Sequence, residues 1–263
     1  MKKLFLIILS VLIANVFSQK MLVNTKDGSS TSFDLINVDN ITFELGSIPD
    51  TSYLFDTTEF ARHSSAYNYA PGTNDFAYGV WLKVVGDNVG RFMDTHNTDN
   101  WYSDRFGLFV QPENVMSITN EGTSDNRVKL TSKTKISKNV WYHIVCARRS
   151  NVMYMYINGV LDTSIANSNN IGSSGYMTLG GSAYNNYGYR CGDVVAAHVF
   201  VVDGTLQDSD VSDLYNGIKT PLEVGSECKG WWKFNEGTGT TVNDASGFGV
   251  NLTLDKGTNW QIK

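Results

Sequence analysis

The amino-acid sequence predicts an all-β protein, an antiparallel β-sandwich with one short helix. Apolar and polar residues alternate in many short runs, which is typical of strands that bury one face. Glycine and asparagine separate these runs, and the chain has 24 glycines and 13 tyrosines. Only one segment has helical signals. Short strands at regular spacing with such turns favour a sandwich or barrel over a mixed α/β fold.

Residues 76–85, FAYGVWLKVV, are the clearest strand, because positions 76, 78, 80, 82 and 84 place apolar side chains on one face. In the hairpin that ends at residues 158–159, Asn-Gly supplies the positive φ angles of a tight turn. We expect Trp81, Trp141 and Trp232 to fill the core or its edge. The other expected strands are 52–56, 106–110, 114–118, 127–132, 141–147, 151–159, 176–181 and 193–203.

The expected helix covers the sequence DVSDLYNG, residues 210–217. Asp208 or Ser209 is the predicted N-cap, because a short polar side chain can accept hydrogen bonds from the first free backbone N–H groups. Gly217 is placed to end the helix, since glycine readily adopts the left-handed conformation of a C-terminal cap.

Residues 1–18 are predicted to be a signal peptide. Lys2 and Lys3 precede an apolar run at 4–16, and cleavage before Gln19 fits the small or branched residues ahead of it. The run is short for a membrane span, and no later stretch approaches that length. We therefore expect a secreted, periplasmic or cell-surface protein without a membrane span after cleavage; an uncleaved anchor is the alternative.

Residues 19–48 are predicted to form a small N-terminal β-hairpin segment, with Asp27-Gly28 at its turn. Residues 46–50, GSIPD, mark the join to the main domain, which we place at residues 49–263.

The charge balance argues against a nucleic-acid partner. The formal net charge is −5, and removal of Lys2 and Lys3 leaves 19 basic against 26 acidic residues, or −7. No Lys/Arg cluster offsets this balance, and phosphate neutralisation is the main source of nucleic-acid affinity.

The three cysteines fit no zinc motif. Cys146 lies in an apolar strand and is expected to pack as a small hydrophobe. Cys191 and Cys228 flank turn-like glycines and could form a disulfide if the fold brings them together.

Four blocks of sequence occur in an order that resembles laminin-G-like, concanavalin A-like jelly-roll domains. They are SYLFD with FAYGVWLKV, WYHIVCARRSNVMYMYINGVL, MTLGG with VFVVDGTLQDSDVSDLYNG, and the tail GWWKFNEGTGTTVNDASGFGVNLTL. The resemblance covers residues 51–263 and implies a concanavalin A-like antiparallel jelly roll. The tail block is expected near the front of such domains, whereas here it closes the chain.

Glucanases share this implied fold, but their paired carboxylates on one strand, spaced E-x-D-x-x-E, do not occur here. The glutamates lie in loop-like contexts, no G-x-S-x-G elbow is present, and His143 belongs to the W-x-H hairpin, where it is expected to serve structure. The sequence therefore predicts a non-catalytic protein; a glycoside hydrolase is the less favoured alternative.

Calcium is the candidate bound metal ion, because the family resemblance implies an ion held by loop oxygens in many relatives. Asp244, in the DASG turn, is the best match, with Asp56 and Asp203 as weaker candidates. An Asx turn is an equal interpretation of Asp244. His198 stands where relatives often carry an acidic residue, which puts a calcium ligand there in doubt.

Two loops carry aromatic and amide side chains that suit a sugar. Residues 94–105 contain Trp101 and Tyr102. Residues 182–190 contain Tyr184, Asn185, Asn186, Tyr187 and Tyr189. Aromatic rings can stack on sugar rings while amides exchange hydrogen bonds with hydroxyls. Capping of the sandwich end by these rings is the alternative.

Together these patterns predict an exported, non-catalytic protein for glycan recognition or adhesion, with calcium as a candidate cofactor and a glycan or cell-surface polysaccharide as partner. A structural or protein-interaction module with a protein partner is the alternative. We also expect residues 232–234 and 250–254 to pair inside the same sandwich, beside the strand at 52–56, because their apolar side chains would otherwise be exposed.

Overall fold

The computed structural model describes residues 20–24, 30–34, 48–67, 69–96, 103–122, 126–172, 175–183 and 189–262. The chain divides into two units, Met1–Glu44 and Leu45–Lys263. In the first unit, β1 (Lys20–Asn24) and β2 (Ser30–Asp34) pair antiparallel, with Lys20 opposite Asp34. The predicted signal peptide at 1–18 lies outside the described residues. In the described part of the chain, no helix has the length and apolar character needed to span a membrane.

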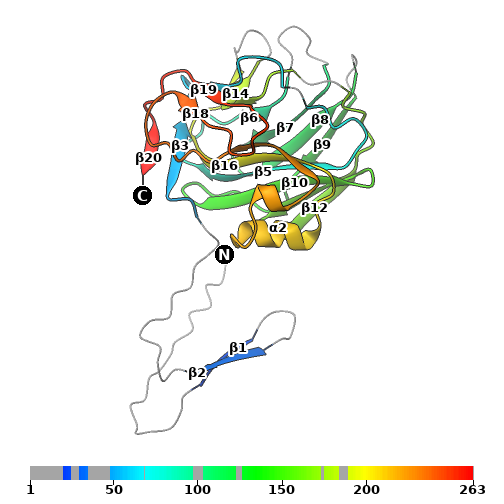
Figure 1. The fold of residues 1–263 in the computed structure, drawn as a ribbon, viewed down its shortest axis with the longest axis vertical. Coiled ribbons are helices and arrows are strands. Elements are labelled where there is room, and N and C mark those ends of the chain that lie inside the picture. The colour runs from blue at the N-terminus through cyan, green and yellow to red at the C-terminus, as the bar shows by residue number, and fades with distance from the viewer. Residues whose placement is uncertain are drawn as a thin grey trace. The chain divides into compact units, whose positions relative to one another are not determined.

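The second unit is a sandwich of two antiparallel sheets (Figure 1), as the sequence predicts. The order of the first sheet is β12-β11-β10-β5-β16-β3-β20, and β17 also pairs with β16. Its strands are β3 (Thr51–Phe55), β5 (Phe76–Val84), β10 (Trp141–Arg149), β11 (Val152–Ile157), β12 (Val160–Ala166), β16 (Val194–Asp203), β17 (Glu227–Trp232) and β20 (Trp260–Ile262).

The second sheet has the order β18-β19-β4-β13-β6-β7-β8-β9. Its strands are β4 (Ala61–Arg62), β6 (Arg91–Asp94), β7 (Arg105–Val110), β8 (Val115–Asn120), β9 (Arg127–Thr131), β13 (Thr178–Leu179), β18 (Thr241–Val242) and β19 (Leu252–Leu254). A short ladder of β14 (Gly181–Ser182) and β15 (Tyr189–Arg190) lies beside β6. The main core fills the space between the two sheets and includes Phe76, Tyr78 and Val80 of β5.

A second apolar cluster covers the outer face of the first sheet. Here α2 (Asp208–Tyr215) and the 3-10 turn η2 (Pro221–Glu223) pack on Ala77, Val145 and Phe200, so that β5 and β10 are buried on both faces. The predicted N-cap is wrong by one residue. It is Gln207, whose backbone N–H donates to the Asp210 carboxylate at 3.0 Å. Gly217 follows with φ 68° and ends the helix as expected.

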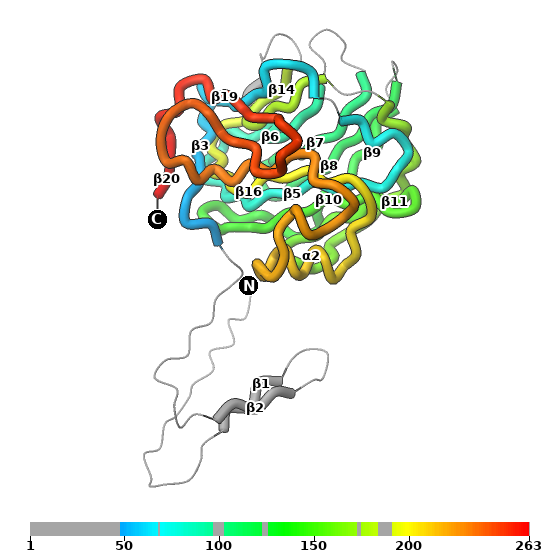
Figure 2. The backbone as a smooth tube through the Cα atoms, viewed as in Figure 1, coloured from blue at the N-terminus to red at the C-terminus, as the bar shows by residue number. Residues whose placement is uncertain are grey.

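The C-terminal tail belongs to the sandwich, but the predicted pairing of its two strands with each other is wrong. Trp232 lies on β17 in the first sheet, whereas residues 252–254 form β19 in the second sheet and pair with β4. The strand that closes beside β3 is β20. Figure 2 shows this tail, coloured orange to red, returning to the early blue strands. The apolar tail residues are buried because both sheets receive strands from it.

The possible disulfide between Cys191 and Cys228 does not form, since all three cysteines are free and buried. Cys191 belongs to the core between the sheets, whereas Cys228 belongs to the cluster on the outer face. The first sheet therefore separates the two thiols. Cys146 packs in the core, as expected for a small hydrophobe.

Candidate functional site

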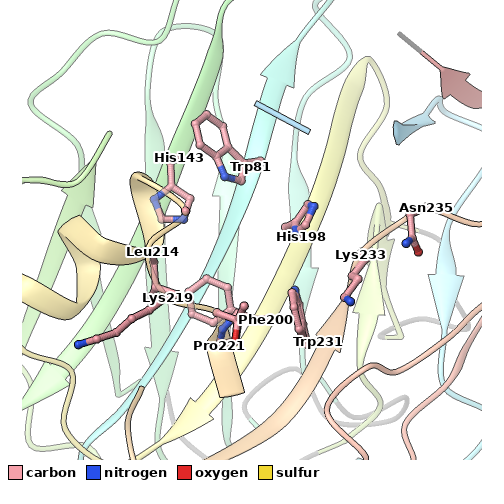
Figure 3. Close-up of a pocket in the computed structure, with 12 residues that line it drawn as sticks. Trp81, His143, His198, Phe200, Leu214, Lys219, Pro221, Trp231, Lys233 and Asn235 are labelled. Atoms are coloured by element: carbon pink, nitrogen blue, oxygen red, sulfur yellow. The ribbon is translucent and has the colours of Figure 1, made fainter. Parts of the chain in front are cut away.

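A pocket of about 370 Å³ lies on the outer face of the first sheet, next to the end of α2, and we call it the α2 pocket. Figure 3 shows Trp81 and His143 on neighbouring strands, with His198, Trp231 and Lys233 further across the sheet. The volume of the α2 pocket is near the lower end of the range of about 300–1,000 Å³ for small-molecule sites. The sheet side comprises Trp81, His143, His198, Phe200, Trp231 and Lys233; Leu214, Gly217, Lys219, Thr220, Pro221 and Asn235 complete the lining.

The aromatic group at one side of the pocket follows from strand register. Trp81 of β5 and His143 of β10 are direct cross-strand partners, and their ring centroids lie 5.1 Å apart. Tyr215, the last residue of α2, stacks on Trp81 at 5.6 Å with an interplanar angle of 23°. Trp81 therefore faces outward under the helix. It is buried, at 5% exposed, but at the edge of the core on the outer side of the sheet, because odd-numbered positions of β5 point away from the space between the sheets.

The Asn-Gly turn after β11 holds this group in place. Asn158 and Gly159 have φ values of 54° and 75°, as the predicted tight hairpin requires. The Asn158 side-chain oxygen accepts a hydrogen bond from the His143 backbone N–H at 2.9 Å. A Cβ added to Gly159 would lie 3.1 Å from the Tyr215 side chain and would force it to shift, so glycine suits both this close approach and the positive φ.

A β-bulge aims His198 into the pocket. Along β16 the register with β5 shifts between Ala197 and Phe200, so one extra residue is inserted. His198 occupies the bulge with φ 49°, which is uncommon for a residue with a side chain. The bulge changes which positions face the core, from Ala196 before it to Val199 after it. His198 consequently joins the outward-facing residues. Strained backbone of this kind is found more often at ligand sites than elsewhere.

Two polar nitrogens of the pocket lining are buried without a hydrogen-bond partner in the described structure. They are Nδ1 of His143, whose side chain is 2% exposed, and Nε1 of Trp231, which is 6% exposed. An unsatisfied buried donor or acceptor costs about 1–3 kcal/mol, and most such groups in folded proteins do find a partner. Both atoms lie beneath the pocket surface, so ligand hydroxyl groups reach them only when the neighbouring side chains shift.

The pocket lining contains four basic side chains, those of His143, His198, Lys219 and Lys233, and they differ in whether their charge is present and balanced. Burial, and secondarily the nearby His198, lowers the pKa of His143 to about 3. Burial, and then the positive charge of Lys233, lowers the pKa of His198 to about 4. Both imidazoles are therefore neutral at pH 7. Lys219 forms ion pairs with Asp210 and Asp213 at 2.8 and 3.1 Å, which leaves Lys233 as the charge exposed to a ligand.

The loop residues predicted to contact a glycan lie outside the described residues, apart from Tyr189, whose backbone is in β15. They are Trp101, Tyr102, Tyr184, Asn185, Asn186 and Tyr187. The structure does bring the bases of the two loops together, because β6 ends at Asp94, β7 begins at Arg105, and Ser182 of β14 accepts a hydrogen bond from Arg91 of β6 at 3.1 Å. Their contact with a sugar stays a prediction.

The three predicted calcium ligands do not come together. Asp244 accepts hydrogen bonds from five donors in the tail: the backbone N–H groups of Trp231, Ser246, Gly249 and Val250, and the Ser246 hydroxyl. Asp56 is hydrogen-bonded to Thr58 and Asn259, and Asp203 to the Tyr69 hydroxyl. Over the described ranges, no three His, Cys, Asp or Glu side chains are grouped to hold a metal. Because N–H donors take up the Asp244 oxygens, these residues do not fit a calcium ion jointly, and calcium binding stays a prediction.

One feature of the sequence indicated an outer layer over the first sheet, where the α2 pocket lies. This feature is the apolar character of both faces of the central strands, which a search for apolar and polar alternation does not detect. Several outward positions of β5 and β10 carry apolar residues, among them Ala77, Trp81 and Val145, which indicates a sheet covered on both faces. Near-continuous apolar runs such as 76–85 therefore pointed to an outer layer.

Comparison with known proteins places this geometry in a family. No match is found among curated proteins. A solved structure of a proposed carbohydrate-binding protein from Bacteroides ovatus ATCC 8483 matches with a TM-score of 0.60 and 14% identity, over 89% of this chain and 66% of that protein. A heptameric SAP-like pentraxin from Limulus polyphemus matches with a TM-score of 0.53 and 13% identity, over 81% and 97% of the two chains.

A third structure, the CBM40 of the Ruminococcus gnavus IT-sialidase bound to α2,3-sialyllactose, matches with a TM-score of 0.50 and 12% identity, over 65% of this chain and 99% of that one. At these identities the likenesses concern the fold. The family model described as the concanavalin A-like lectin/glucanases superfamily matches residues 55–212, more than half of the chain. The protein belongs to the concanavalin A-like lectin/glucanases superfamily.

Proposed function

We propose that this protein is a non-catalytic carbohydrate-binding protein that holds a saccharide in the α2 pocket. The observation that carries this proposal is the combination of aromatic walls with the two unpartnered nitrogens of His143 and Trp231. A sugar ring has an apolar face of C–H groups and a rim of hydroxyls. The face can pack against the exposed edges of the Trp81 and Trp231 rings, and the hydroxyls can bind the Asn235 amide directly and the two buried nitrogens once the side chains around them shift.

The comparisons support the carbohydrate class. The Bacteroides ovatus neighbour is described as a proposed carbohydrate-binding protein, and the Ruminococcus gnavus module is bound to sialyllactose. The match to the lectin/glucanases superfamily agrees with this class as well. The fold of these neighbours extends over most of the present sandwich, which therefore offers a comparable scaffold for a glycan site.

The pocket chemistry argues for binding rather than hydrolysis. Glycosidases need two carboxyl groups on either side of the scissile bond, and no Asp or Glu is among the described residues that line the pocket. The loop glutamates are engaged in surface or turn contacts instead. Their partners are Lys135 for Glu113, Asn126 for Glu121, Thr220 for Glu223, Lys229 for Glu227 and Asn243 for Glu236.

The finer elements of the proposal come from the sequence. The predicted signal peptide supports export, to the periplasm, the cell surface or the medium, where polysaccharides are accessible. The aromatic loops at 94–105 and 182–190 supply a second candidate contact surface for a longer glycan. Calcium would act, if it binds, on those loops or on the tail rather than through a side chain of the α2 pocket.

A glycan array tests the proposal. The full chain is expected to bind at least one saccharide, and Trp231→Phe is expected to weaken that binding about fivefold or more, because the variant keeps an aromatic side chain but loses one hydrogen-bond donor worth about 1 kcal/mol. Its melting temperature should fall modestly, because the smaller ring leaves part of the space of the buried indole unfilled. Trp141→Phe is the matched control, because Trp141 lies on the same sheet face outside the pocket.

Three results bear on the outcome. A blank array for the wild-type chain, with and without calcium, would contradict carbohydrate binding. Equal weakening by Trp141→Phe would contradict the pocket as the site. Weaker saccharide binding by Trp231→Phe, with unchanged binding by Trp141→Phe, would support carbohydrate binding and the α2 pocket as its site.

A further inference from the structure

We propose that the α2 pocket selects an acidic saccharide, one whose negative charge sits against Lys233. The inference rests on the proposed carbohydrate-binding function and adds the charge class of the ligand. Lys233 follows β17 directly and is half-buried. Its Nζ lies 4.2 Å from the centre of the Trp231 ring, at the aromatic wall where a sugar would pack.

Among the described residues, Lys233 has no acidic partner. Throughout the part of the chain that the structure describes, no Asp or Glu forms an ion pair with this lysine, whereas the other lysine of the lining, Lys219, is held by Asp210 and Asp213. No carboxylate is among the described lining residues either. The lining consequently carries one uncompensated positive charge in a partly desolvated place, where a charge acts more strongly than in water.

The neighbouring groups add no charge of their own at neutral pH. Burial keeps His143 and His198 neutral, and the positive charge of Lys233 is the second cause that lowers the pKa of His198. The positive charge of Lys233 therefore acts on groups inside the pocket, as its effect on His198 indicates. An anionic group placed there gains a charge-assisted hydrogen bond, which is about twice as strong as a neutral one.

The chain contains a matched cation-on-tryptophan pair outside the pocket. Lys83 of β5 lies over the ring of Trp141 of β10, with Nζ 5.1 Å from the ring centre, and neither residue lines the pocket. Replacing either lysine by methionine keeps a similar apolar stem on the tryptophan face and removes one charge. The pair Lys233→Met and Lys83→Met thus differs only in where the charge is lost.

Calorimetric titration with matched monosaccharides tests the inference. The probes are glucose and galactose, their uronates, and their 6-sulfates. We expect one acidic form to bind the full chain about tenfold more tightly than its neutral parent. Lys233→Met should reduce the ratio of the affinities for the acidic and the neutral sugar to near unity. Lys83→Met should retain the full preference, and both variants should melt as the wild type does.

The outcomes separate this inference from the proposed function. Equal affinity for neutral and acidic forms would contradict the charge preference and leave carbohydrate binding intact. An acidic preference that survives Lys233→Met would overturn the role of this lysine. A uronate or a 6-sulfate preference would each support an anionic ligand and would identify carboxylate or sulfate as its source. Absence of binding to all six probes and to the array would contradict both proposals.

Discussion

Deletion of residues 229–263 is expected to abolish cooperative folding. The deleted segment supplies part of β17 to the first sheet, β18 and β19 to the second, and β20 beside β3. Trp232 is fully buried and donates a hydrogen bond from Nε1 to the Val250 backbone oxygen at 2.6 Å. The other tail residues in the main core are Phe234, Val242, Val250, Leu252 and Leu254.

The expected size of the loss exceeds the stability of an ordinary domain. Removing one buried tryptophan or phenylalanine side chain costs about 3–5 kcal/mol, whereas a folded domain is stable by about 5–15 kcal/mol in total. The tail carries one of each together with four aliphatic core residues. Loss of β19 and β20 would also expose the edges of β4 and β3, which invites aggregation.

Thermal melting followed by circular dichroism measures this effect. The control is a chain that ends at residue 259 and lacks only β20, which should still melt cooperatively at a lower temperature because Trp260 is only partly buried. A soluble chain ending at residue 228 that melts in one cooperative transition would contradict the account of the tail.

Asp244→Ala is expected to destabilise the protein by about 3 kcal/mol or more, with or without calcium. The substitution leaves the four backbone N–H groups and the Ser246 hydroxyl without their common acceptor, in a tail segment that is partly buried. This result would favour the Asx-turn interpretation of Asp244 over the calcium interpretation.

The Asp244 carboxylate also makes the stability of the fold depend on pH, and the direction of this dependence follows from its pKa. Partial burial alone would raise its pKa, but hydrogen bonds from the Ser246 hydroxyl and from backbone N–H groups outweigh burial and lower it. A depressed folded pKa contributes stability that is present above the unfolded pKa of about 4 and is lost as the pH falls through the folded value. We therefore expect the cost of Asp244→Ala to be full at pH 7 and smaller in acid.

Urea unfolding in EDTA and in calcium chloride measures both effects. Asp87→Ala is the control, because Asp87 makes an exposed ion pair with Lys138, which contributes at most about 1 kcal/mol. A loss of stability that appears only in calcium chloride would contradict the Asx turn and restore Asp244 as a metal ligand.

The strands that could be predicted from the sequence are those whose apolar residues are also buried in the structure. The run at 76–85 and the strand at 141–147 are rich in apolar, aromatic and β-branched residues, and both are central strands of the first sheet. The edge strand β12 has exposed apolar residues such as Val160 mixed with polar ones, so no alternation marked it. β6 was missed because Arg91 and Asp94, which form an ion pair there, are buried in it.

The candidate site could not be predicted in the same way, because it depends on contacts between distant segments. The bulge at His198 resets the alternation of β16, and a strict period of two would have placed this side chain in the core. Trp231 and Lys233 reach the pocket only because β17 pairs with β16, a long-range contact that no local pattern encodes. The family resemblance predicted the sandwich, whereas the predicted glycan contacts lie in its loops and not on the outer face of the first sheet.

Nuclear magnetic resonance of the tryptophan indole groups tests the central claim most directly. The chain has six tryptophans, so a nitrogen-15 spectrum gives six indole N–H signals, which single Trp→Phe variants assign. When the saccharide selected on the array is added, the Trp231 signal is expected to move downfield, because its N–H gains the acceptor that it lacks in the free protein. The Trp141 signal should not move. A shift of the Trp101 signal with Trp231 unchanged would contradict the account and assign the glycan to the predicted loop.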